Sequence, residues 1–327
     1  MDLDAMIDGV RGGKRRALAR AITLVESARS EDRKAAAALL DGVADPRRQA
    51  LRIGLSGTPG VGKSTFIEAS GLMLIGQGRS VAVLAVDPSS TRSGGSILGD
   101  KTRMPQLSRD PRAFIRPSPS QTELGGVARR TREAIALCEA AGFDVVIVET
   151  VGVGQSETIV AQMTDIFTLL LAPGGGDELQ GVKRGIMEIA DLILINKADG
   201  DMKAQAERTR ADYAGALHLL RRRDGDPEGF PKALSVSSTE DAGLSQAWEE
   251  MASLADYRRG TGHWDRTRAA QSRHWFEEAV RHGIVRHLTA DAATRARMED
   301  LGRAVAAGET APSAAADRMI EHLFGRD

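Results

Sequence analysis

The sequence lacks the features of a disulfide-stabilised or membrane-embedded protein. Cys138 is the only cysteine among 327 residues, which excludes an intramolecular disulfide and a thiolate metal cage. No segment approaches the roughly 18 apolar residues of a membrane span, and the N-terminal residues lack the apolar stretch of a signal peptide. We therefore expect a soluble, cytoplasmic protein with no membrane partner.

An excess of charge of one sign is also missing. The 44 Lys and Arg residues balance 45 Asp and Glu residues, so the formal net charge is −1. Such a protein has no general positive field to attract nucleic acid, and we expect no nucleic-acid partner. The short basic clusters at 14–16 and 221–223 and the scattered histidines are interpreted as solvated surface.

The pattern of apolar residues predicts three regions. Residues 1–48 have apolar positions at helical spacing and predict two or three short helices as an N-terminal extension. Between 49 and 258, short apolar runs alternate with helix-compatible segments, which is typical of a doubly wound α/β domain with a buried, mostly parallel sheet. The strands are expected at 53–56, 81–86, 145–148, 166–171, 192–195 and 233–236.

Residues 259–327 are expected to form a helical arm. Phe276, Val280, Ile284 and Leu288 recur every four residues and so form an apolar stripe on a helix. An apolar stripe outside a complete α/β domain must be covered, either by a second copy of the chain or by the chain's own domain. We favour a homodimer in which this arm is the dimerisation element.

The strongest motif is a phosphate-binding P-loop, which follows a predicted strand and opens a helix-compatible segment. In such a loop the backbone N–H groups and the helix N-terminus bind phosphate oxygens. Lys63 is expected to bridge the β- and γ-phosphates and assist catalysis, and the Ser64 hydroxyl to bind Mg²⁺. The residues of this loop are Gly57, Thr58, Pro59, Gly60, Val61, Gly62, Lys63, Ser64 and Thr65.

The second motif is the sequence Asn196-Lys197-Ala198-Asp199 at the end of a predicted strand. A carboxylate there can accept hydrogen bonds from N1–H and the 2-amino group of guanine, a pair that adenine does not offer, so the motif predicts selectivity for GTP and GDP over ATP. The alternative is a polar turn with cap residues. The loop Ser237, Ser238 and Thr239 is a candidate for backbone contact with guanine, or else a helix cap.

A third motif follows the predicted strand that ends near 148. Glu149 at the strand tip is expected to contact Mg²⁺ or one of its water ligands and so to take part in catalysis. Gly152 and Gly154 then provide a hinged loop that is typical of a switch sensing the γ-phosphate. Gln155 either orients the attacking water or is an ordinary loop residue.

Two further segments are candidate switches. Asp87, after the second strand, and Asp100, after a glycine- and serine-rich stretch, either approach Mg²⁺ or the attacking water, with Asp87 as a candidate catalytic residue, or act as turn caps. The segment 173–184 contains Asp177, directly after three consecutive glycines, and Lys183, and it is either an additional switch or a solvated connection.

The motifs G-T-P-G-V-G-K-S-T, D-P-S-S-T-R and E-T-V-G-V-G-Q-S-E, in this order, resemble the MeaB/ArgK family of P-loop GTPases, which act as G-protein chaperones. The resemblance covers nearly the whole chain. It implies a homodimeric GTPase whose partner is methylmalonyl-CoA mutase, with adenosylcobalamin bound only through that partner. By matched motif, nucleotide and Mg²⁺ roles fall on Lys63, Ser64, Asp87, Asp100, Glu149, Asn196, Asp199 and the loop at Ser237, while Asp177 and Lys183 lie in a third switch.

Three alternatives remain at this stage. A nickel-insertion GTPase would need His and Cys ligands that this sequence lacks. A kinase or ATPase of a transport system would need to use ATP, against which Asp199 argues. A nucleotide-gated scaffold that binds GTP and barely hydrolyses it is compatible with every motif, because a catalytic group can come from the partner.

Overall fold

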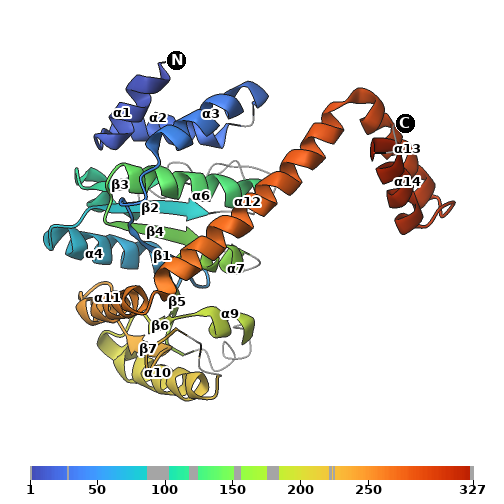
Figure 1. Ribbon diagram of the computed structural model, residues 1–327. Helices are drawn as coiled ribbons and strands as arrows, with labels where there is room; N and C mark the ends of the chain where they lie inside the picture. The colour runs from blue at the N-terminus through green and yellow to red at the C-terminus, as the bar shows by residue number, and fades with distance from the viewer. Residues whose placement is uncertain are drawn as a thin grey trace. The chain divides into compact units, whose positions relative to one another are not determined.

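The computed structural model describes residues 2–27, 29–86, 103–117, 124–150, 156–174, 184–220, 223 and 225–324 (Figure 1). They form two compact units, Met1–Thr267 and Arg268–Asp327. The first unit contains the sheet and the N-terminal helices, and the second contains helices alone.

A seven-stranded sheet forms the centre of the first unit, and all its pairings are parallel. The strand order β3-β2-β4-β1-β5-β6-β7 places β1 in the middle. Six strands confirm the predicted apolar runs; β3 was missed because it has only three apolar residues before Arg116. The bounds are β1 Leu51–Ser56, β2 Val81–Val86, β3 Ala113–Arg116, β4 Val145–Thr150, β5 Ile166–Leu171, β6 Leu192–Ile195 and β7 Lys232–Ser235.

Helices cover both faces of this sheet (Figure 1). Along each strand the side chains point alternately to the two faces of the sheet. Those of one face form a single core with helices α4 and α11, in which Ile67 and Leu254 are fully buried. Helices α6 and α7 pack against the strands from the other face, and α10 packs along β6 and β7. The bounds are α4 Lys63–Gly76, η1 Leu107–Arg109, α6 Leu124–Ala140, α7 Ser156–Ala161, α9 Arg184–Ile189, η2 Gly200–Met202, α10 Lys203–His218 and α11 Leu244–Gly260.

The N-terminal extension consists of three helices, as predicted: α1 Leu3–Arg11, α2 Arg15–Glu26 and α3 Ser30–Val43. They pack on α6. The apolar positions Leu18, Ile22 and Val25 of α2 are each no more than 1% exposed. Burial of this stripe makes the extension part of the first unit.

A buried ionic network lies at the edge of the sheet where β5 and β6 begin. The Arg258 guanidinium, 8% exposed, donates to Asp191 Oδ1 at 2.7 Å and to Asp226 Oδ1 from Nε at 2.9 Å and Nη2 at 2.7 Å. Arg223 also donates to Asp191 Oδ1 at 2.8 Å. Because parallel strands carry binding sites at their carboxyl ends, this network belongs to the structural side of the sheet.

Helix α12 (His263–Ala290) crosses from the first unit into the second, where α13 (Ala292–Ala306) and α14 (Pro312–Phe324) pack on each other. The prediction of a helical C-terminal region is confirmed. Along α12 the side chains of Phe276, Val280 and Ile284 are 68%, 42% and 48% exposed. Among the described residues, no helix combines the length and apolar character that crossing a membrane requires.

Candidate nucleotide site

The P-loop connects the carboxyl end of the central strand β1 to the first turn of α4. Gly57 and Gly62 are required there for different reasons. A Cβ at Gly57 would lie 2.3 Å from the Leu170 carbonyl oxygen, and a Cβ at Gly62 would lie 2.7 Å from Asn196 Nδ2 on a backbone with φ of 94°. The backbone therefore approaches its neighbours too closely for larger residues, and no side chain caps the helix N-terminus at Gly62.

Lys63, the first residue of α4, folds back over this loop. Its Nζ donates hydrogen bonds to the carbonyl oxygens of Gly57 at 2.6 Å and Thr58 at 3.3 Å. Burial lowers the pKa of the Lys63 ammonium, while the negative charge of Glu149 opposes that shift. The ammonium is thus held over the P-loop with a carboxylate near it, at the position where phosphate oxygens bind in a P-loop.

Asn196 links three loops that are far apart in the sequence. Its Nδ2 donates to the Val61 carbonyl oxygen at 2.9 Å, and its Oδ1 accepts from the Ser238 backbone N–H at 3.2 Å and the Ser238 hydroxyl at 2.7 Å. Asn196 itself is 2% exposed. Lys197 adds a second link, because its Nζ donates to the Gly60 carbonyl oxygen at 2.8 Å. The predicted phosphate and base motifs are therefore joined into one site.

The Asp199 carboxylate is held by two hydroxyl groups. The Ser237 hydroxyl donates to Asp199 Oδ2, and the Thr239 hydroxyl donates to the same oxygen at 2.9 Å. These bonds, from Ser237 first and Thr239 second, lower the pKa of the Asp199 carboxyl. Ser237 Oγ also accepts from the Glu240 N–H at 3.1 Å, so the loop acts both as a turn cap and as a support for Asp199.

Two predicted Mg²⁺ ligands lie within the described residues. Ser64 is half-buried in the first turn of α4, and Glu149 is 6% exposed near the end of β4. A hydroxyl and a carboxylate are hard oxygen donors, which suit Mg²⁺ when phosphate oxygens and water complete its shell. The remaining predicted ligand and switch residues lie outside the described residues; they are Asp87, Asp100, Gly152, Gly154, Gln155, Asp177 and Lys183.

Two further charged residues act on Lys63, and neither is among the predicted site residues. Arg103 lowers the pKa of Lys63, after burial as the main cause, and Glu157 raises it. Glu157 is fully buried at the start of α7, and Arg103 is exposed. The sequence gives no sign that Glu157 is buried, because its burial depends on the packing of α7 against β1 and β4.

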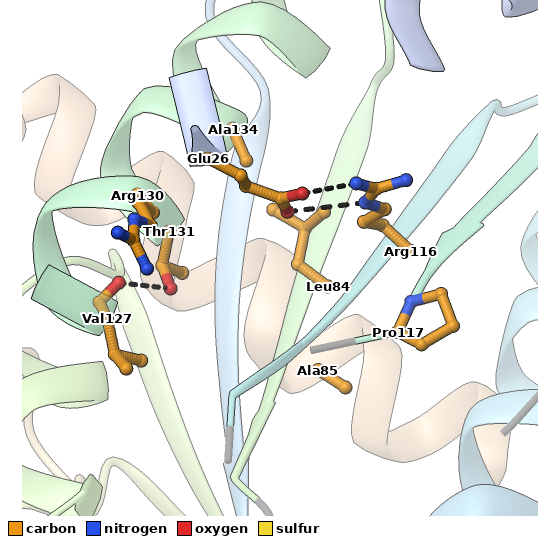
Figure 2. Close-up of a pocket in the computed structure, with 9 residues that line it drawn as sticks. All are labelled: Glu26, Leu84, Ala85, Arg116, Pro117, Val127, Arg130, Thr131 and Ala134. Carbon is orange, nitrogen blue, oxygen red and sulfur yellow. Dashed lines mark hydrogen bonds and ion pairs between the residues drawn. The ribbon is translucent and has the colours of Figure 1, made fainter. Parts of the chain in front are cut away.

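A small cavity lies at the carboxyl ends of β2 and β3, between α2 and α6 (Figure 2). Across it, Arg116 and Glu26 form an ion pair, and the Thr131 hydroxyl donates to the Val127 carbonyl oxygen at 2.9 Å. Its volume of about 20 Å³ is enough for roughly one water molecule. This cavity is too small for a nucleotide, and its ion pair joins the N-terminal helices to the sheet.

A parallel α/β sheet with a P-loop after its central strand, and an N-K-x-D motif bonded to that loop, defines a P-loop GTPase. Residues 18–293 match the family described as Methylmalonyl Co-A mutase-associated GTPase MeaB. The chain belongs to this family, which confirms the resemblance seen in its motifs, and it is a GTPase.

Individual relatives agree with this assignment. The chain is 49% identical to GTPase ArgK of Escherichia coli over 282 residues, covering 86% of this chain and 85% of that protein. It is 45% identical to the mitochondrial Methylmalonic aciduria type A homolog of Mus musculus over 334 residues, covering 99% of this chain and 80% of that protein. A crystal structure of a LAO/AO transport system kinase superposes with a TM-score of 0.75 at 38% identity, covering 98% of this chain and 97% of that one.

Proposed function

We propose that this GTPase assists adenosylcobalamin loading and protection of methylmalonyl-CoA mutase, and that it acts in the cytoplasm. The observation that carries the proposal is the match over residues 18–293 to a family described as associated with that mutase. The similarity to the methylmalonic aciduria type A homolog over 99% of the chain adds support. In this proposal the cobalamin is the partner's cofactor, and the GTPase supplies a nucleotide-dependent conformational signal.

In the proposed nucleotide site, the P-loop residues 57–65 bind the phosphates and Asp199 reads the guanine base. The hydroxyls of Ser237 and Thr239 support this role, because they hold Asp199 Oδ2 in place and stabilise its ionised form. Asn196 fixes the distance between base and phosphate sites through its bonds to Val61 and Ser238. A site arranged in advance loses less entropy when the ligand binds.

We further propose that Ser64 and Glu149 hold Mg²⁺ with the nucleotide, together with Asp87 and Asp100. When bound, Mg²⁺ would neutralise charge on the β- and γ-phosphate oxygens. Lys63 would leave the Gly57 and Thr58 carbonyls and donate to those same oxygens, stabilising the charge that develops as water attacks. Gly152, Gly154, Gln155, Asp177 and Lys183 remain proposed switch residues.

The proposed assembly is a homodimer formed through the C-terminal arm, 259–327. Its support is the stripe of Phe276, Val280 and Ile284, which stays exposed on α12 at four-residue spacing. Light scattering should give twice the chain mass of 34.9 kDa for the wild type, and a smaller mass for Ile284→Asp. His282→Ala, an exposed residue on the opposite face of the same helix, is the matched control. A wild-type mass equal to one chain would exclude the dimer.

The mutase partnership is tested by measuring GTP and ATP hydrolysis by the purified protein, alone and with an adenosylcobalamin-dependent methylmalonyl-CoA mutase. We expect hydrolysis that is selective for GTP, rises when the mutase is added and disappears in Lys63→Ala. Lys203→Ala, an exposed lysine of α10, controls for loss of a positive charge. GTP hydrolysis that is indifferent to the mutase would remove the proposed partner while leaving the GTPase intact.

The same assay separates the remaining functions. Turnover of ATP at least as fast as that of GTP would favour the kinase or ATPase function. Selective GTP binding without turnover, even with the mutase, would favour a nucleotide-gated scaffold. A nickel-insertion role has less support, since no group of His, Cys, Asp or Glu within the described part of the chain is arranged to hold a metal ion.

A further inference from the structure

Two buried hydroxyl groups meet at the carboxyl ends of β1 and β4. The register between these neighbouring strands ends at the pair Leu55 and Glu149. One residue later, the Thr150 hydroxyl donates a hydrogen bond to the Ser56 hydroxyl at 2.9 Å. Thr150 is fully buried and Ser56 is 1% exposed. Side chains therefore continue the connection between the two strands one residue beyond their backbone register.

Each of these hydroxyl groups adjoins a residue of the candidate nucleotide site. Ser56 directly precedes Gly57, the first residue of the P-loop, whose carbonyl oxygen accepts from Lys63. Thr150 directly follows Glu149, a proposed Mg²⁺ ligand. The hydrogen bond thus joins the strand end that leads into the P-loop to the strand end that carries Glu149.

The hydroxyl pair and the Glu149 side chain lie on opposite faces of the sheet. Register partners point to the same face and successive residues to opposite faces. Leu55, the partner of Glu149, belongs to the core formed with α4, whose first turn contains Ser64. Thr150 and Ser56 therefore lie on the other face, where α7 packs against β1 and β4. Removing either hydroxyl changes no side chain on the face of the proposed metal site.

The same bond connects the two halves of the sheet. Thr150 is in register with Val86, the last residue of β2, and Asp87 follows Val86 in the sequence. Ser56 is in register with Leu169 of β5, and β6 and β7 lie beyond β5 in the strand order. One half of the sheet thus leads to two of the proposed Mg²⁺ ligands, and the other half leads to the P-loop and the base motif.

We propose that Thr150 and Ser56 are positioning residues of this GTPase, whose hydrogen bond holds Glu149 at a fixed distance from the P-loop and so sets how tightly the nucleotide complex binds Mg²⁺. Mg²⁺ requires near-ideal octahedral geometry, so a small separation of the two strand ends is enough to weaken its binding. The hydroxyls act through the strand ends and not by contact with the metal. This inference rests on the Mg²⁺ site proposed at Glu149.

The test compares Thr150→Val, which removes the hydroxyl and nearly keeps the shape, with Thr168→Val. Thr168 is a fully buried threonine of β5, and its hydroxyl has no hydrogen-bond partner in the part of the chain that the structure describes. The affinity for a fluorescent, non-hydrolysable GTP analogue is titrated at increasing Mg²⁺ and in EDTA, and urea unfolding checks each fold. Ser56→Ala removes the same bond from its other end, and it carries the comparison if Thr150→Val does not fold.

We expect Thr150→Val to raise the Mg²⁺ concentration needed for half-maximal tightening of nucleotide binding by about 3- to 10-fold, the effect of roughly one hydrogen bond. Its affinity in EDTA should equal that of the wild type. Ser56→Ala should give the same shift, and the double variant should shift no further, because both substitutions remove one bond. Thr150→Ser should restore most of the wild-type response, and Thr168→Val should leave it unchanged.

Two results would overturn the proposal. One is a Mg²⁺ requirement of Thr150→Val equal to that of Thr168→Val. The other is an equal loss of affinity with Mg²⁺ and in EDTA, because that pattern belongs to a bond that supports the whole nucleotide site.

Glu149→Ala separates these failures from failure of the proposed metal site. If Glu149→Ala raises the Mg²⁺ requirement and Thr150→Val does not, only the positioning role is wrong. If neither substitution raises it, the Mg²⁺ site proposed at Glu149 is wrong, and the positioning role is wrong with it.

Discussion

Replacing Asn196 by alanine should loosen the nucleotide site as a whole. The Asn196 side chain makes three hydrogen bonds, one to the Val61 carbonyl oxygen and two from Ser238. Val61 and Ser238 are 2% and 7% exposed, so water cannot easily replace the lost partner. At about 0.5–1.5 kcal/mol for each bond, the free energy of unfolding should fall by roughly 2–4 kcal/mol.

The same change should weaken GTP and GDP about equally, by roughly 10- to 100-fold, because both nucleotides use the loops that Asn196 joins. Urea unfolding gives the stability, and titration with a fluorescent nucleotide gives the two dissociation constants. Ser238→Ala is the matched control, since it removes the hydroxyl donor alone and leaves the bond from the Ser238 backbone N–H and the bond to Val61. It should lose less stability than Asn196→Ala.

An unfolding midpoint for Asn196→Ala equal to that of the wild type would refute this reasoning. It would mean that the bonds across the three loops add nothing beyond what water supplies. A change in the ratio of GTP to GDP affinity would also contradict it, because Asn196 contacts loops and has no bond that distinguishes the number of phosphates.

Two further substitutions and one labelling experiment test other residues of the protein. Asp199→Asn should weaken the affinity for GTP by roughly 100-fold or more and strengthen the affinity for xanthosine triphosphate, because its 2-oxo group accepts a hydrogen bond from the new amide. Unchanged GTP affinity in a titration would exclude Asp199 as the residue that recognises the base. Arg258→Met should lower the free energy of unfolding by about 3–5 kcal/mol, because it leaves the buried carboxylates of Asp191 and Asp226 without this cation. The GTP affinity of the folded variant, measured at low temperature, should equal that of the wild type. Cys138 is fully buried and its thiol pKa is raised by that burial, so iodoacetamide at neutral pH should label it only in denaturant; rapid labelling of native protein would show that α6 opens.

Most of the sheet was predictable from the sequence because its strands are buried on both faces. The run 166–171 has six buried residues in succession, and all of them except Thr168 are apolar, so the strand is visible in the sequence. Strand β3 was not predicted, because it lies at the edge of the sheet, is four residues long and ends in Arg116. That arginine pairs with Glu26 and donates to the Thr23 hydroxyl, both on α2, which are 90 and 93 residues away in the chain.

The candidate site also has one part that the sequence predicts and one part that it does not. The P-loop is contiguous, so its residue types and spacing are visible in the sequence. The support of Asp199 was not predictable, because the Ser237 hydroxyl reaches it across 38 residues. The sequence left Ser237 open between a base contact and a helix cap, whereas the structure shows its hydroxyl donating to Asp199 and accepting from Glu240.

The contacts of each residue determine which measurement its substitution should change. The Asn196 side chain bonds to the P-loop and to the loop at Ser238, so its loss should lower stability and the affinities of GTP and GDP together. Asp199 is held by hydroxyls that leave its other oxygen for a base, so its loss should change the preference among bases. If both substitutions changed the same quantity, the site would be a single cooperative unit, and the separate roles assigned to Asn196 and Asp199 would be wrong.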